Sequence, residues 1–161
     1  MKNKLFKKLF NIRILKRIYL ERMGEPLIYN MVSLYYLMFG SFTKKIEYDL
    51  VPRQPYAFGL DDAFKNARKE GVSSIIIIEF GVAAGAGLYN LKFIAERLKN
   101  IYKVDYEIYG FDTGLGMPPP VDYRDHPEKY YTGDFPPGKL LEQELPENVE
   151  IIYGEISKNI T

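Results

Sequence analysis

The feature that most constrains this sequence is an apolar strand that leads directly into a glycine-containing loop. Residues 73–80 include four consecutive isoleucines, a pattern that predicts a strand buried on both faces, as in a parallel sheet. The loop of residues 79–87 follows, and apolar residues then recur at helical spacing: Leu88, Leu91, Ala95 and Leu98. A strand, a tight loop and a helix in this order predict an α/β fold with a nucleotide site.

The residues of this loop indicate the kind of ligand as well as the backbone conformation. Gly81, Gly85 and Gly87 permit positive φ and close approach of a ligand, and the first N–H groups of the following helix supply donors. Glu79 stands two residues before the first glycine. A carboxylate there suits a ligand with an ammonium group, by direct contact or by ordering the loop, and would repel a pyrophosphate. S-adenosylmethionine has such a group, and we predict this cofactor.

Two further acidic residues follow predicted strands. Residues 106–111 predict the second strand, and Asp112 follows at the position where open α/β sheets present an acidic group to ribose hydroxyls. An Asp that only begins a turn is the alternative. Residues 149–153 predict the third strand, and Glu155 after it could accept a hydrogen bond from an adenine amino group or be an ordinary loop residue.

Two segments carry a family resemblance: Ile78-Glu79-Phe80-Gly81-Val82 with Gly85, and Gly110-Phe111-Asp112-Thr113 with Gly116-Met117-Pro118. They resemble class I, Rossmann-like S-adenosylmethionine-dependent methyltransferases related to macrocin O-methyltransferases, and the similarity covers about residues 58–161. The resemblance implies methyl transfer to a small-molecule oxygen acceptor. It also implies a set of cofactor-binding residues: Glu79, Gly81, Gly85 and Gly87 at the methionine and ribose end, Asp112 at the ribose, Glu155 near the adenine, and Thr113.

The sequence departs from this family in its long loop of residues 117–138 and in where it stops. Family members continue through further strands with an Asp-rich magnesium motif and the acceptor pocket, so Mg²⁺ is expected only through residues beyond this chain. A parallel sheet that halts after its third strand would expose apolar surface. We therefore expect the 161 residues to be a fragment, and a homo-oligomer that completes its sheet is the alternative.

The long loop contains the only local candidates for a catalytic base, Asp125 and His126, which could equally form a turn that ends at Pro127. No cysteine is present and His126 is the only histidine, which excludes a His/Cys zinc cluster. The acidic residues of the loop match no metal motif in their spacing, and we predict no metal site in this chain.

The glycine spacing leaves other classes open. GxxxGxG also resembles the turn of NAD(P)-dependent short-chain oxidoreductases, although none of the tyrosines has a lysine four residues later. A turn with three glycines could also be purely structural. A third alternative is a membrane-associated or adaptor protein that works through residues 1–43.

The chain before the sheet is predicted as a separate part, with residues 1–58 forming a helical segment and connector and residues 59–161 forming the cofactor-binding half-domain. Residues 1–22 contain Glu21 and eight basic residues: Lys2, Lys4, Lys7, Lys8, Arg13, Lys16, Arg17 and Arg22. Residues 2–12 predict a basic amphipathic helix that packs on the domain or touches an anionic surface. We expect a cytoplasmic protein with no nucleic-acid partner, and residues 2–20 as the candidate for peripheral membrane contact.

Residues 26–43 contain no charge and just reach the length of a membrane span. Pro26, Gly40 and a polar line of Asn30, Ser33 and Ser41 favour a buried helix or a lid instead. Prolines and Gly59 within residues 51–59 predict an extended connector. Asp61 is then expected to cap a short helix that ends at Gly71.

Overall fold

The structure, a computed structural model, describes residues 16, 20, 24, 26–138 and 145–155. It divides into two compact units, Met1–Lys65 and Asn66–Thr161. The division falls inside helix α5 (Gln54–Glu70), and the boundary predicted at residues 58–59 lies earlier in the same helix. The predicted amphipathic helix of residues 2–12 lies outside the described residues.

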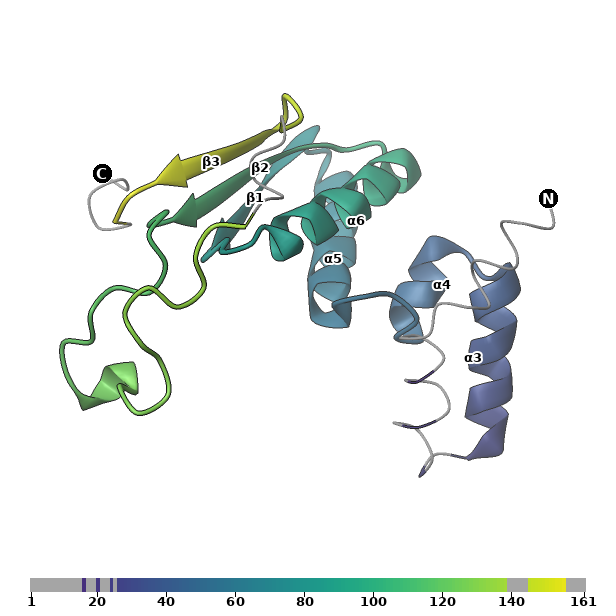
Figure 1. The fold of residues 1–161 in the computed structure, drawn as a ribbon. Helices are drawn as coiled ribbons and strands as arrows, with labels where there is room; N and C mark the ends of the chain where they lie inside the picture. The colour runs from purple at the N-terminus through teal and green to yellow at the C-terminus, as the bar shows by residue number, and fades with distance from the viewer. Residues whose placement is uncertain (1–15, 17–19, 21–23, 25, 139–144, 156–161) are drawn as a thin grey trace. The chain divides into compact units, whose positions relative to one another are not determined.

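The first unit contains a helical pair, α3 (Leu27–Phe39) and α4 (Phe42–Glu47) (Figure 1). Gly40 lies between the two helices. A Cβ at this position would lie 2.6 Å from the Tyr36 carbonyl oxygen, so the close turn requires glycine. The helices enclose a small core around Leu37, where the rings of Tyr36 and Tyr48 pack 4.6 Å apart. The expectation of a buried helix was wrong, because only Ser33 and Leu37 are buried in α3.

Helix α5 also corrects two predictions. The expected connector over residues 51–59 is helical from Gln54 onward, so Asp61 lies inside the helix and does not cap it. Pro55 is tolerated because it occupies the first turn, where a missing N–H breaks no hydrogen bond of the helix. The end of the helix was predicted correctly: Gly71 follows it with φ +74°.

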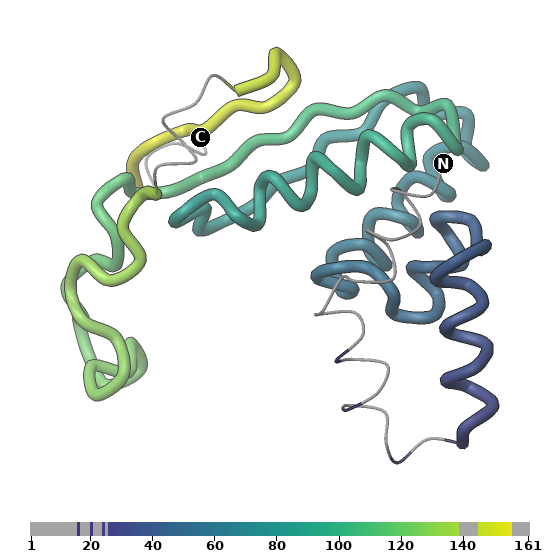
Figure 2. The backbone as a smooth tube through the Cα atoms, turned by 45° about the vertical axis from the view of Figure 1, so that its right-hand side comes forward, coloured from purple at the N-terminus to yellow at the C-terminus, as the bar shows by residue number. Residues whose placement is uncertain are grey.

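The second unit is an α/β arrangement whose sheet is parallel, as predicted. Its strands are β1 (Ser74–Phe80), β2 (Asp105–Asp112) and β3 (Val149–Tyr153), in the spatial order β1-β2-β3. Helix α6 (Ala86–Tyr102) makes the connection from β1 to β2 and contacts β2 (Figure 2). The short helix predicted between residues 138 and 149 falls largely outside the described residues.

One face of the sheet packs against α6. Ile77, Ile108 and Val149 are register partners across the three strands and are all buried. The predicted apolar residues of α6 are buried as well: Leu88, Leu91, Ala95 and Leu98. This packing brings the first turn of α6 close to the end of β1, where Gly87 packs against Glu79.

The other face of β1 contradicts the prediction of a strand buried on both faces. Ile76, Ile78 and Phe80 are 52–65 % exposed. Successive side chains of a strand point to opposite faces, and α6 covers only the face of Ile77. An unbroken apolar run cannot reveal which of its two faces is covered.

We predict that Gly110 in β2 cannot accept a side chain without cost. A Cβ on Gly110 would lie 2.6 Å from Val82 Cγ2 and 3.3 Å from Leu88 Cδ1. Gly110→Ala should therefore lower the free energy of unfolding in urea by about 1–3 kcal/mol. Val82→Ala makes room, so the double variant should lose less than the sum of the two single losses. Strictly additive losses would contradict this packing.

Candidate functional site

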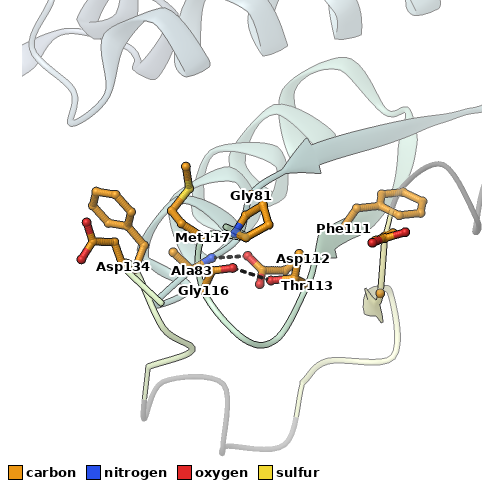
Figure 3. A pocket seen from close by; sticks show the side chains of 12 residues that line it. Gly81, Ala83, Phe111, Asp112, Thr113, Gly116, Met117 and Asp134 are labelled. Carbon is orange, nitrogen blue, oxygen red and sulfur yellow. Dashed lines mark hydrogen bonds between the residues drawn. The ribbon is translucent and has the colours of Figure 1, made fainter. Parts of the chain in front are cut away.

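A cavity of about 540 Å³ lies at the carboxyl ends of the strands. The strands are parallel, so the loops that follow them meet at one edge of the sheet. Gly81 and Ala83 come from the loop after β1, and Asp112 comes from the end of β2 (Figure 3). Glu155 comes from the segment after β3. The structure thus brings together residues that the sequence separates by more than seventy positions.

The backbone after β1 makes a tight turn into α6. Gly81, Ala83 and Gly85 have φ of +80°, +46° and +84°, which is the left-handed region that favours glycine. The Gly81 N–H donates to the Phe111 carbonyl at 2.8 Å and so fixes the loop to the neighbouring strand. Ala83 adopts the same region with a side chain, at a cost of about 1–2 kcal/mol. That strain requires a compensating interaction.

The compensating interaction comes from Asp112. Its Oδ2 accepts a hydrogen bond from the Ala83 N–H at 2.8 Å, and its Oδ1 accepts one from the Gly114 N–H at 2.8 Å. One carboxylate therefore ties the glycine loop to the loop after β2. Each carboxylate oxygen has two lone pairs, so Asp112, which lines the cavity, has acceptor capacity beyond these two bonds.

Glu79 lies near the end of β1, close to the first turn of α6. Neither Glu79 nor Gly85 or Gly87 lines the cavity. The Glu79 side chain is 7 % exposed and packs against Gly87, where a Cβ would lie 2.9 Å from the Glu79 carboxyl carbon. Gly87 is thus required by close packing. Gly85 precedes α6 as its N-cap and provides no side-chain cap. Of the two roles predicted for Glu79, this position favours ordering of the loop, because negative charge is stabilised near a helix N-terminus.

Thr113 and Glu155 complete the predicted set at the cavity. Thr113 Oγ1 donates to the Gly116 carbonyl at 2.7 Å and accepts from the Leu115 N–H at 3.2 Å, so it shapes the turn after β2. The Gly154 N–H donates to the Asp112 carbonyl at 2.9 Å, which holds the end of β3 beside β2. Glu155 follows directly and is exposed at the cavity.

The long loop after β2 supplies lining residues outside the predicted cofactor-binding set, including Met117 and Phe135. The loop closes on itself, because the Met117 N–H donates to the Asp134 carbonyl at 2.7 Å and the Gly133 N–H donates to the Met117 carbonyl at 2.9 Å. A second cavity, of about 450 Å³, shares Thr113 and Glu155 with the first. Leu115, Pro119 and Thr132 line only this second cavity.

Asp125 and His126, the predicted candidates for a base, lie in this loop and line neither cavity. Asp125 Oδ2 accepts from the Val121 N–H at 2.7 Å and takes part in the capping of the short helix η2 (Tyr123–Asp125). His126 Nδ1 lies 3.0 Å from Glu128 Oε1. These contacts describe an ordered turn in which neither Asp125 nor His126 lines a cavity.

The acidic residues of the loop are engaged in local contacts. The Arg124 side chain hydrogen-bonds to Asp122 and lowers the pKa of that carboxyl. Within residues 26–138 and 145–155, no group of three or more His, Cys, Asp or Glu side chains is placed to hold a metal ion.

In the same part of the chain, no helix has the length and apolar character needed to cross a membrane.

Comparison with known proteins gives no match for this chain among protein-family models, curated proteins or solved structures.

The double contact of Asp112 generates a prediction about local stability. Asp112→Asn replaces one acceptor oxygen with an NH₂ group, so an amide donor then faces the N–H of Ala83 or Gly114. Opening of the two loops should become easier by at least about 1 kcal/mol, the usual worth of a hydrogen bond. Hydrogen exchange of the Ala83 and Gly114 amides measures this change.

The matched control is Asp125→Asn, because this carboxylate is hydrogen-bonded within the long loop and lines neither cavity. It should leave exchange at Ala83 and Gly114 unchanged. Equal effects of the two variants would contradict the specific role of Asp112.

Proposed function

We propose that the second unit binds S-adenosylmethionine, as the cofactor-binding half of a class I, Rossmann-like methyltransferase. The observation that carries the proposal is the cavity at the ends of the parallel strands, with Asp112 between the glycine loop and the loop after β2. Open α/β sheets bind ligands at this edge. The cavity volume falls within the range of about 300–1,000 Å³ that is usual for small-molecule sites.

The chemistry of the lining fits the parts of this cofactor. Under the proposal, the ribose hydroxyls donate to Asp112, whose oxygens retain acceptor capacity. The adenine enters the adjoining cavity, where Leu115 and Pro119 offer apolar contacts and Glu155 offers an acceptor for the amino group. The methionine end runs along the backbone of Gly81 and Ala83 toward α6.

Glu79 favours this cofactor over a nicotinamide dinucleotide. A dinucleotide places its pyrophosphate at the N-terminus of the helix after the glycine loop. Here the Glu79 carboxylate packs against Gly87 in the first turn of α6. A buried carboxylate at that position repels a pyrophosphate more strongly than it would in open water.

The proposed reaction is methyl transfer to a small molecule with an oxygen nucleophile. When bound, the cofactor supplies an electrophilic methyl group on a sulfonium. The task of the protein is to hold the methyl group and the acceptor in line, since alignment provides a large share of the acceleration in such reactions. The loop residues Met117 and Phe135 offer apolar contacts beside the cofactor cavity and help to exclude water.

Calorimetry tests the proposal. We expect saturable binding of S-adenosylmethionine to the full chain and none of NAD. Asp112→Asn should weaken the binding by roughly fivefold or more, the equivalent of about 1 kcal/mol.

A ligand change separates contact with the ribose from ordering of the loop. If Asp112 contacts the ribose, the 2′-deoxyribose analogue should bind the normal protein more weakly, and Asp112→Asn should distinguish little between the two ligands. Equal discrimination by both proteins would assign Asp112 to the loop alone. Binding of NAD without binding of S-adenosylmethionine would overturn the proposed function.

A further inference from the structure

Helix α3 exposes a continuous apolar stripe. The side chains of the stripe are each at least 58 % exposed: Leu27, Ile28, Met31, Tyr35 and Phe39. Four of them recur every fourth residue, so they lie along one side of the helix, and Ile28 adjoins them. The buried residues of α3, Ser33 and Leu37, lie on the opposite side.

Among the described residues of the first unit, the small core does not include this stripe. Its small core forms around Leu37 and Leu50, with Tyr36 and Tyr48 packed against them. Single exposed apolar residues are common on protein surfaces, but a contiguous apolar patch marks an interaction site. Five large side chains on a helix of 13 residues form such a patch.

The charge of the same unit indicates what covers the stripe. Residues 1–22 contain eight basic residues and only Glu21 as an acidic one, and no residue of α3 is charged. A basic segment that precedes an exposed apolar helix in the sequence complements an anionic lipid surface, because the surface attracts the positive charge and takes up apolar side chains. A second copy of the chain would carry the same basic segment, and like charge opposes pairing.

We propose that α3 docks on the surface of an anionic lipid bilayer, with its stripe of Leu27, Ile28, Met31, Tyr35 and Phe39 in the interfacial layer. The 13 residues of α3 extend about 20 Å, less than the apolar thickness of about 30 Å, so the helix lies along the surface and does not cross it. Tyr35 suits that depth, because its ring is apolar and its hydroxyl stays hydrated. The proposal is independent of the cofactor site.

Sedimentation of the full chain with vesicles tests this docking. Vesicles of phosphatidylcholine with phosphatidylserine should pellet the protein, whereas pure phosphatidylcholine should pellet much less. Leu27→Asp with Met31→Asp should weaken binding to the anionic vesicles by tenfold or more, since burial of one large apolar side chain alone is worth about tenfold. Circular dichroism checks that the helical content of the double variant is unchanged.

The matched control is Val121→Asp, which places the same charge at a residue of the second unit that is 91 % exposed. It should bind vesicles as the normal protein does. Failure of the normal protein to bind anionic vesicles would overturn the proposal, as would equal binding by the normal protein and the α3 variant. Self-association that the α3 variant abolishes, without vesicle binding, would assign the stripe to a second copy instead.

Discussion

The candidate site depends on one carboxylate. Asp112 accepts the N–H of Ala83 from the loop after β1 and the N–H of Gly114 from the loop after β2, both at 2.8 Å. The first of these bonds holds Ala83 at a φ of +46°, which a residue with a side chain rarely adopts. Without Asp112, the side-chain hydrogen bond that holds the Ala83 N–H in this strained conformation would be lost. The same carboxylate that shapes the cavity is therefore the group proposed to bind the ribose.

The sheet makes this arrangement available. Gly81 donates to Phe111, and Gly154 donates to the carbonyl of Asp112, so each strand end is tied to its neighbour. Parallel pairing brings the three loops to one edge, and the packing of α6 against β2 brings its first turn to the end of β1. Close packing then limits the sequence: Gly87 leaves room for Glu79, and Gly110 leaves room for Val82. Space requires these two glycines, since neither Gly87 nor Gly110 has the positive φ that favours glycine.

Much of this unit could be predicted from the sequence, because strong local patterns specify it. The limits of β3, the end of α5 at Gly71 and the apolar face of α6 were all predicted correctly. Two features were predicted wrongly. The exposure of one face of β1 depends on what packs against the strand, and the start of α5 depends on the tolerance of the first turn of a helix for proline. The bond between Asp112 and Ala83 spans 29 residues and leaves no local signal. The uncharged sequence of α3 likewise predicts a buried helix and does not show that one side of the helix is exposed.

The central claim is that the cavity at the strand ends receives S-adenosylmethionine, and backbone amide chemical shifts test it most directly. Titration with this ligand should move the amide resonances of Gly81, Ala83, Gly114 and Glu155 along one saturable curve, whereas those of α3 should stay in place. NAD at the same concentrations should leave all of them unmoved. Saturable shifts confined to residues outside the two cavities, or no shifts at all with S-adenosylmethionine, would contradict the account.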